Sequence, residues 1–237
     1  MTSTEVPNSA LWEQELKAAW GNHASNVRFL GQVGLPKRGM RILEIGCGQG
    51  PMMQFLRSLG HDVIGVDATI EPLQRWDHRG RVCVASGEHL PFPDDSFDLV
   101  LSFDVFEHVP DSDQHLRDVA RVLRRPGHYL IGTPNKWTNS LIEPIMWTKR
   151  VGFRRALHCF EPPGHCSLHN FWQLRDRFSR NGYQPRFFDI PVVNDYFFAK
   201  IRHLFGSAGV GLVKLVNPDR LPLYMRTNFY VAAALPE

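Results

Sequence analysis

Apolar residues along the middle of the chain alternate between two spacings. Short, nearly continuous apolar runs have the length of strands, at 40–46, 61–66, 81–85, 97–102 and 128–132. Between them, residues 51–59 and 113–124 carry apolar residues at helical spacing, with Gly60 and the Arg125-Pro126-Gly127 break as stop signals. Strands that are apolar on both sides are typical of a parallel sheet covered by helices on both faces. The pattern therefore predicts an α/β fold.

The two ends of the chain extend this pattern. Residues 9–34 have helical spacing, and a helix over 169–180 ends at Asn181-Gly182. Strands are expected at 186–193 and 227–235, which brings the predicted total to seven. No internal repeat or low-complexity tract divides the chain, so we expect a single domain.

Two segments do not follow the alternation of strands and helices. Residues 136–168 and 194–225 carry aromatic residues, and the first is also rich in histidine. We interpret both as lid and acceptor-binding elaborations, added to a core over 40–135 and to an N-terminal helical cap over 1–36. Residues 196–216 mix aromatic, basic and small apolar residues, which leaves open a helix that lies on a membrane surface.

Composition and charge narrow the class of protein. With 43% apolar and 22% charged residues, the chain can build a core and is not disordered. A net charge of +3 is too small to indicate nucleic-acid binding. No apolar run approaches the roughly 20 residues that cross a bilayer, and the N-terminus lacks a signal-peptide pattern. The four cysteines include no Cys-x-x-Cys pair, so we expect reduced thiols in a cytoplasmic protein without stable membrane insertion.

A glycine-rich turn joins the first strand to the first helix. Residues 46–50 read Gly-Cys-Gly-Gln-Gly, and glycine lets a ligand approach the backbone without a Cβ in the way. In an open α/β sheet this turn lies at the carboxyl edge of the strands, where ligands bind. A dinucleotide fingerprint needs a third glycine where the chain has Pro51, which disfavours a dinucleotide-dependent oxidoreductase. Asp67 ends the next strand and is suited to hold the hydroxyls of a ribose.

Four segments in series carry a resemblance to a known family: Glu-Ile-Gly-Cys-Gly-Gln-Gly at 44–50, Gly-Val-Asp at 65–67, residues 87–100, and Glu-His-Val at 107–109. The chain resembles class I S-adenosylmethionine-dependent methyltransferases, within them the small-molecule group that includes ubiquinone-biosynthesis O-methyltransferases and natural-product enzymes. The resemblance covers about residues 40–135. It implies a Rossmann-like, seven-stranded, mostly parallel sheet with helices on both faces and an antiparallel last strand. It also implies S-adenosyl-L-methionine as cofactor and a small-molecule acceptor.

The resemblance further implies a role for each matching position at the cofactor. Gly46, Cys47 and Gly48 would pass under the methionine and ribose portions, with Glu44 setting the loop. Asp67 would take the ribose hydroxyls. The other implied positions are Ala68 against the adenine, Ser86, Gly87 and Glu88 at the adenine edge, and Ser102 and Phe103 at the methionine end. Since Ser86 stands where family members often have Asp, backbone N–H groups of this segment are expected to meet the ring.

The segment after the fourth strand offers a base for the proton of an acceptor. If this turn is helical, Asp104, Glu107 and His108 share one face, which would orient His108 as a base or bind a divalent cation. The element resembles the acid-x-x-Glu-His pattern of metal-dependent 2′-O-methyltransferases of small RNAs and of the ubiquinone enzymes. Of the two alternatives, we prefer that Glu107 and His108 hold the loop by hydrogen bonds over a role in binding a metal. We therefore assign no metal ligand.

A second cluster lies near the end of the predicted lid. It contains three histidines and two cysteines, at positions 158, 159, 165, 166 and 169. Without a Cys-x-x-Cys knuckle it fits structural zinc poorly. We expect the lid to bring His165 to the acceptor pocket, which makes His108 and His165 the predicted catalytic residues. If a metal binds, Glu107, His108 and His165 are the set to test.

The resemblance and these clusters together predict a reaction. The sulfonium of the cofactor is already a strong electrophile, so the protein mainly has to align the acceptor behind the methyl group. We expect O-methylation of a small molecule by in-line displacement, with His-assisted deprotonation or an already anionic acceptor oxygen. A DNA base is disfavoured as the acceptor, because residues 102–105 lack the Pro-Pro-aromatic signature of nucleic-acid amino-methyltransferases. The alternatives are a metal-assisted 2′-O RNA methyltransferase, although RNA is disfavoured, and a non-enzymatic scaffold. The sequence leaves the oligomeric state open.

Overall fold

The computed structural model describes residues 22–37, 39–69, 81–138 and 165–236. The α-helices are α2 (His23–Val33), α3 (Pro51–Ser58), α5 (Ser112–Val122), α8 (Phe171–Arg180) and α9 (Asp195–Leu215). The strands are β1 (Arg41–Ile45), β2 (Asp62–Asp67), β3 (Val82–Val84), β4 (Phe97–Phe103), β5 (Leu123–Pro134), β6 (Gln184–Phe188) and β7 (Asn228–Ala234). Short 3-10 helices are η1 (Phe106–His108), η2 (Pro218–Arg220) and η3 (Leu223–Met225).

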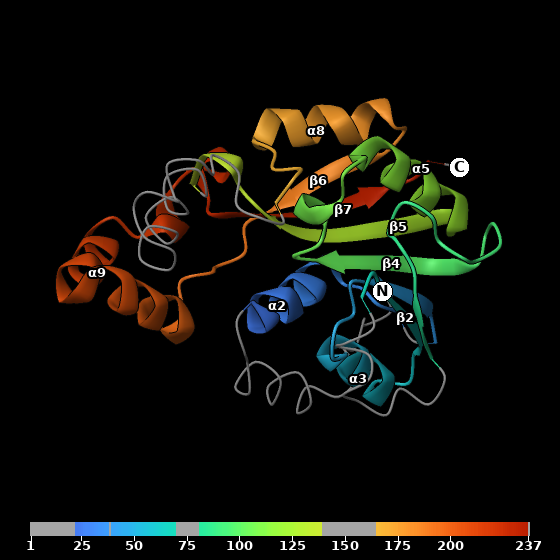
Figure 1. Ribbon diagram of the computed structural model, residues 1–237, viewed down its shortest axis with the longest axis horizontal. Helices are drawn as coiled ribbons and strands as arrows, with labels where there is room; N and C mark the ends of the chain where they lie inside the picture. The colour runs from blue at the N-terminus through green and yellow to red at the C-terminus, as the bar shows by residue number, and fades with distance from the viewer. Residues whose placement is uncertain (1–21, 38, 70–80, 139–164, 237) are drawn as a thin grey trace, which may run out of the picture.

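The strands form one seven-stranded sheet in the order β3-β2-β1-β4-β5-β7-β6 (Figure 1). The first five strands along the chain pair in parallel. Strand β7 inserts between β5 and β6 and is antiparallel to both. The predicted mostly parallel sheet with an antiparallel last strand is therefore confirmed.

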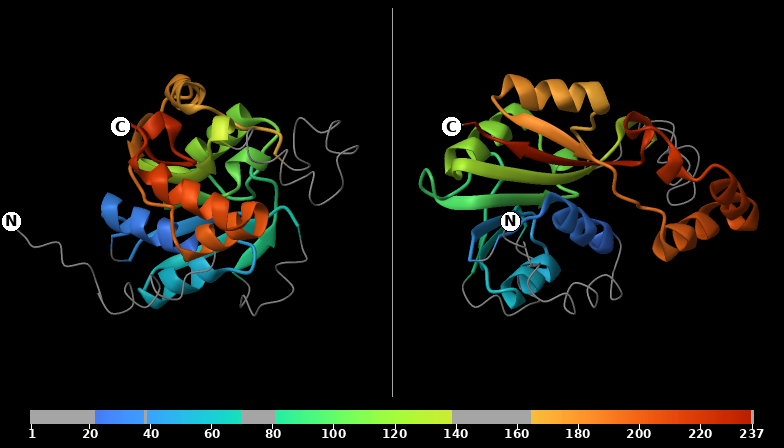
Figure 2. Two further views of the ribbon diagram at one scale, coloured as in Figure 1. Left: turned by 90° about the vertical axis from the view of Figure 1, so that its left-hand side faces the viewer. Right: turned by 180° about the vertical axis from the view of Figure 1, so that it is seen from behind.

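Helices cover the sheet on both faces, with α5 and α8 on one side and α2 and α3 on the other (Figures 1 and 2). Successive residues of a strand point to opposite faces, which divides the core in two. In β1, Leu43 and Ile45 belong to the cluster on the α5 and α8 side, whereas Ile42 belongs to the cluster on the α2 and α3 side. Phe29 of α2 is fully buried against the sheet, and its ring centroid lies 5.3 Å from that of Tyr230 in β7.

The start of β5 differs from the sequence prediction. The helix expected over 113–124 ends at Val122, and Leu123 already pairs with Phe97 of β4. The next pair in the ladder joins Leu99 to His128, so residues 124–127 form a bulge opposite a single residue of β4. That residue is Asp98, whose carboxylate accepts hydrogen bonds from Arg124 Nη1 at 2.9 Å and from the backbone N–H of Arg41 at 2.7 Å. The break at Pro126 thus interrupts a strand and not a helix.

The strand expected over 186–193 is also displaced, because β6 ends at Phe188. Residues beyond it have another use for their backbone donors: the N–H groups of Val192 and Val193 bond to the carboxylate of Asp219, at 3.0 and 2.9 Å. Asp219 follows α9 in the sequence, whereas Val192 and Val193 precede it. The contact therefore joins the two ends of this helical segment. The prediction failed because the competing acceptor is distant in the sequence.

The two predicted elaborations have different outcomes. Much of the first, together with the N-terminal residues before Asn22, lies outside the described residues. The second contains α9, followed by η2 and η3, and α9 projects away from the sheet in Figure 1 and in the right-hand view of Figure 2. Within the described ranges, no helix combines the length and the apolar character that a bilayer span requires.

Candidate cofactor and acceptor site

The glycine-rich turn after β1 has the backbone conformation that the sequence predicts. Gly46, Gly48 and Gly50 all have positive φ, at 71°, 52° and 76°, which favours glycine at each position. A Cβ added to Gly46 would overlap Cγ2 of Val105, whereas one added to Gly48 would meet nothing within 4 Å. Gly46 is therefore required by close packing beneath the turn, and Gly48 lies on the side that is open to a ligand.

Asp67, at the end of β2, is held against this turn. One oxygen of its carboxylate accepts the backbone N–H of Gly48 at 3.0 Å. The other oxygen accepts the backbone N–H and the hydroxyl of Thr69, both at 3.0 Å. The carboxylate is half-buried, and Ala68 beside it is exposed. The structure thus brings together the glycine turn and the acidic side chain that the sequence assigns to the ribose.

Glu44, near the end of β1, and Cys47 of the turn are buried behind the turn. Burial raises the pKa of Glu44 to about 8, against the lowering effect of a hydrogen bond from the backbone of Met53, and its Oε2 has no hydrogen-bond partner. The thiol of Cys47 is also buried, and an added Cβ on Gly65 would lie 2.6 Å from its Sγ. Burial raises the pKa of the Cys47 thiol to about 12, so the thiol is not a nucleophile. Cys47 presents only its backbone to a ligand.

The segment expected at the adenine edge is tied to α5. The carboxylate of Glu88 accepts the backbone N–H of Asp111 at 2.6 Å, just before α5 begins, and the Glu88 N–H bonds to Ser86 Oγ at 3.2 Å. The Glu88 side chain therefore anchors the segment, and its own N–H is engaged. Gly87 is held separately, through its carbonyl.

A buried network that the sequence pattern did not predict supports Gly87. Nδ1 of His115 lies 2.8 Å from the Gly87 carbonyl, and Nε2 lies 2.6 Å from the Tyr129 hydroxyl. A carbonyl only accepts, so Nδ1–H donates to Gly87 and Nε2 accepts from Tyr129. Burial lowers the pKa of His115 to about 4, which keeps the ring neutral and this donor pattern intact. The signal in the sequence was a histidine at an apolar position of a helix.

The turn after β4 is a short 3-10 helix, η1, and not the α-helix that would place three polar side chains on one face. Asp104 precedes η1 with a positive φ of 55°. Its carboxylate accepts two hydrogen bonds from Nδ2 of Asn22, at 3.1 and 3.0 Å. Asp104 therefore joins the start of α2 to the carboxyl edge of the sheet, and the predicted grouping of Asp104 with Glu107 and His108 is not formed.

Glu107, His108 and His165 do come together. Glu107 is buried, and its Oε2 accepts the hydroxyl of Thr133 at 2.9 Å. Its Oε1 lies 4.0 Å from Nε2 of the exposed His108. The rings of His108 and His165 have centroids 4.7 Å apart, and one ligand atom from each of the three residues lies within 4.8 Å of the others. His165 reaches this position because the backbone N–H of Ser167 bonds to the carbonyl of Glu107 at 2.9 Å.

Ser102 and Phe103, the remaining predicted positions, and the nearby Asn135 have structural contacts of their own. Ser102 is fully buried in β4. Phe103 is half-buried, and its ring meets that of Phe29 edge-on, with centroids 6.4 Å apart. Asn135, which follows β5, donates to the carbonyls of Tyr224 and Arg226 and so fixes the turn before β7. Contacts of Ser102 and Phe103 with a ligand stay a prediction.

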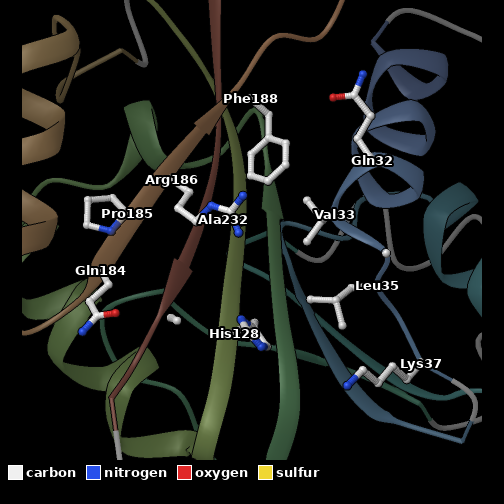
Figure 3. A pocket seen from close by; sticks show the side chains of 12 residues that line it. Gln32, Val33, Leu35, Lys37, His128, Gln184, Pro185, Arg186, Phe188 and Ala232 are labelled. Atoms are coloured by element: carbon white, nitrogen blue, oxygen red, sulfur yellow. The ribbon is translucent and has the colours of Figure 1, made fainter. Parts of the chain in front are cut away.

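A separate groove lies at the opposite end of the strands (Figure 3). It has a volume of about 460 Å³ and lies between the end of α2 and the uncovered parts of β5, β6 and β7, with Lys37, His128 and Arg186 among its lining residues. None of the predicted site residues lines it. This groove is distinct from the site at the carboxyl edge.

Comparisons with known proteins match the part of the chain that carries the glycine-rich turn. A family model described as a methyltransferase domain matches residues 43–131, which include the glycine turn, Asp67 and η1. A protein of Mycolicibacterium smegmatis, described as a probable S-adenosylmethionine-dependent methyltransferase, is 36% identical over 105 residues, 43% of this chain and 41% of that protein. The ubiquinone biosynthesis O-methyltransferase of Sinorhizobium medicae is 32% identical over 139 residues, 53% and 54% of the two chains. The match thus spans about half the length of these relatives.

Solved structures extend the likeness to nearly the whole chain, for the fold alone. A chain of Haloferax volcanii, solved in complex with the Trm112 methyltransferase activator, superposes with a TM-score of 0.68 at 15% sequence identity, over 99% of this chain and 97% of its own. The family resemblance that the motifs indicated is therefore confirmed: residues 43–131 are a methyltransferase domain, set in a chain with the fold and homologues of S-adenosylmethionine-dependent methyltransferases.

Proposed function

We propose that the protein transfers a methyl group from S-adenosyl-L-methionine to an oxygen of a small-molecule acceptor. The observation that carries the proposal is the hydrogen bond between the Gly48 N–H and the Asp67 carboxylate. It places a negatively charged acceptor of hydroxyl groups beside an open stretch of backbone, at the edge of the sheet where α/β proteins bind ligands.

The residues present fit this cofactor. Gly48 leaves backbone open to a ligand, since a Cβ there would meet nothing within 4 Å, and Asp67 supplies the acceptor for a ribose diol. The unpartnered Oε2 of Glu44 is a buried oxygen close to the same turn, where a cationic ligand would favour its ionised form. Gly87, held by His115, presents backbone at the expected adenine edge.

The acceptor side rests on the two histidines. The bound cofactor supplies an electrophilic methyl group, so the chain has to position an acceptor oxygen and remove its proton. His108 is exposed, and its Nε2 lies 4.0 Å from Oε1 of the buried Glu107, which orients the imidazole. His165 faces His108 across 4.7 Å and completes a small polar surface. We assign proton removal to this pair.

One observation favours a second candidate, a metal-assisted methyl transfer such as 2′-O methylation of RNA. Glu107, His108 and His165 offer two imidazoles and a carboxylate within 4.8 Å of one another, a donor set that suits a divalent transition metal. A metal at this place would lower the pKa of an acceptor hydroxyl, which is the task assigned to the histidines above. The hydrogen bond from Thr133 to Glu107 is compatible with either role, since metal-bound carboxylates are commonly hydrogen-bonded.

The proposal is tested by an acceptor screen that measures release of S-adenosylhomocysteine from the full chain. Phenols, alcohols, carboxylic acids and short RNAs are each assayed with chelator and with added Mg²⁺, Mn²⁺ or Zn²⁺. We expect turnover with a small oxygen acceptor and no chelator effect; loss of turnover in chelator, with activity on RNA, would favour the second candidate. Parallel titration with S-adenosylmethionine and with NAD⁺ separates both from an oxidoreductase, and binding of NAD⁺ alone would overturn the proposal.

The raised pKa of Glu44 predicts proton release when the cofactor binds. With a pKa of about 8, this carboxyl group is mostly protonated at pH 7. A bound sulfonium and α-ammonium favour the carboxylate and lower that pKa, so binding at pH 7 releases a proton and the affinity rises from pH 6 to about pH 8 before it levels off.

Calorimetry in two buffers of different ionisation enthalpy measures this proton release. The Glu44→Gln variant keeps the shape of the side chain and cannot ionise, so it should show neither the release nor the rise in affinity. Equal proton release in the wild type and in Glu44→Gln would assign the proton to another group.

A further inference from the structure

The segment between β6 and β7 forms a helical hairpin beyond the sheet, with α9 as its two arms. Gly206 interrupts the helix with a φ of 67° and a ψ of −160°. The arms lie against one another, because Nζ of Lys214 is 5.9 Å from the ring centroid of Phe198 and a Cβ on Gly209 would lie 3.3 Å from Cγ2 of Ile201. Both Figure 1 and Figure 2 show the hairpin projecting past the carboxyl edge of the sheet, the edge that carries the candidate site.

The second arm of the hairpin has an uncovered apolar face. Ala208, Leu212 and Leu215 are spaced i, i+4 and i+7, which places them on one side of a helix, and all three are exposed. Leu212 is 62% exposed and Leu215 is 82% exposed, with Val216 at 50% beside them. Val210, on the other side of this arm, is buried. The hairpin therefore uses one apolar face internally and leaves a second one open.

Beyond its first residue, Asp195, α9 carries charged side chains of one sign only. Residues 196–218 contain no Asp or Glu, but they contain Lys200, Arg202 and Lys214 together with His203. Arg202 and His203 are exposed near the bend at Gly206. The flanking acid Asp219 accepts backbone hydrogen bonds and lies 3.7 Å from Arg226, and the other, Asp195, sits at the first residue of α9. Basic groups therefore dominate the outer part of the hairpin.

A second group of exposed residues lies at the same end of the sheet. The rings of Trp137 and Trp172 have centroids 5.4 Å apart, as do those of Trp172 and Tyr224, and each side chain is about 40% exposed. These residues follow β5, begin α8 and precede β7, so they border the carboxyl edge of β5. Exposed tryptophan and tyrosine are typical of surfaces that contact the interfacial layer of a membrane.

We propose that the α9 hairpin docks the protein on the surface of an anionic lipid bilayer. An exposed apolar face combined with acid-free, basic flanks is the pattern of a helix that lies in the interface, with its apolar residues in the acyl boundary and its cations at anionic headgroups. The hairpin does not span the bilayer, because no helix among the described residues is both long enough and apolar enough to do so. A protein partner would have to offer acidic groups around an apolar groove. An anionic bilayer offers negatively charged headgroups next to an apolar interior over its whole surface.

The docking has a consequence for the reaction, and this part rests on the proposed function. Because the hairpin and the aromatic group both border the carboxyl edge, docking turns the candidate site toward the membrane. An acceptor that partitions into lipid would then reach the site without crossing water. We therefore assign the acceptor to the class of lipophilic molecules with an ionisable oxygen at the interface.

The test measures partition of the full chain onto vesicles by flotation, without cofactor, so its outcome does not depend on the proposed function. Phosphatidylcholine vesicles are compared with vesicles containing about 30% phosphatidylglycerol. We expect partition onto the anionic vesicles to be about tenfold higher, and to fall in about 0.5 M NaCl. The double variant Leu212→Glu/Leu215→Glu should lose it, and Arg202→Gln should weaken it by a few-fold.

Val84→Glu is the matched control, because Val84 is an apolar residue 51% exposed on the edge strand β3, away from the hairpin. It should bind vesicles like the wild type, and circular dichroism checks that all variants are folded. The proposal is overturned if the wild type does not bind anionic vesicles, or if Val84→Glu loses as much binding as the double variant. It is also overturned if light scattering shows a wild-type dimer that the double variant converts to a monomer without any vesicle binding, since the face would then join two copies of the chain.

Discussion

Replacement of Asp67 by alanine lowers the affinity for S-adenosylmethionine by about two orders of magnitude. Hydrogen bonds from two ribose hydroxyls to a carboxylate are charge-assisted, and each contributes about 1.5–3 kcal/mol. The variant also leaves the Gly48 N–H without its acceptor, which loosens the turn under the ligand. Both effects act on binding, so calorimetric titration with S-adenosylmethionine and S-adenosylhomocysteine should show a similar loss for the two ligands.

Two comparisons make this result specific. Asp67→Asn keeps one carbonyl oxygen but removes the charge, so its affinity should fall between those of the wild type and Asp67→Ala. Asp62→Ala changes the same residue type at the opposite end of β2, where the carboxylate is exposed and pairs with Arg41 and Arg81. We expect its affinity to be unchanged, because exposed ion pairs contribute little. An unaltered affinity in Asp67→Ala would remove this residue from the site and, with it, the main support for a nucleoside at this edge.

Replacement of His108 or His165 by alanine slows methyl transfer by about two to four orders of magnitude, while cofactor affinity stays within a few-fold. A base acts on the acceptor's proton and not on the cofactor, so kcat falls and calorimetric binding does not. The loss should shrink as the pH rises, because an acceptor that ionises by itself needs no base. Single-turnover assays between pH 6 and pH 9 measure this.

The controls separate proton removal from two other roles. His128→Ala removes a half-buried histidine in the middle of β5, where it lines the groove of Figure 3, and should keep full activity. Elemental analysis of the purified variants detects a metal: stoichiometric metal in the wild type that both variants lose would identify ligands and not bases. Full activity in both variants, with no metal, would show that the acceptor arrives already anionic.

The order of elements and the cofactor side of the site followed from local sequence. A positive φ is inexpensive only for glycine, so a glycine-rich stretch after an apolar strand marks a turn that bares its backbone. Asp67 ends the neighbouring parallel strand, and the carboxyl ends of parallel strands share one edge. Apolar runs of strand length likewise located every strand. Only the limits of β5 and β6 differed from those that the runs predicted. These features depend on residues that are close together in the chain.

Pairings between distant residues were decided by the tertiary structure alone. The end of β6 depends on Asp219, the bulge in β5 on Asp98, and the position of Gly87 on His115. The approach of His108 to His165 depends on backbone contacts of a returning loop, and the open face of α9 depends on how the two arms pack across Gly206. A sequence pattern records which residues prefer burial and which bend the chain. It does not record which distant donor will meet a given acceptor, because that choice is made only when the whole core has closed.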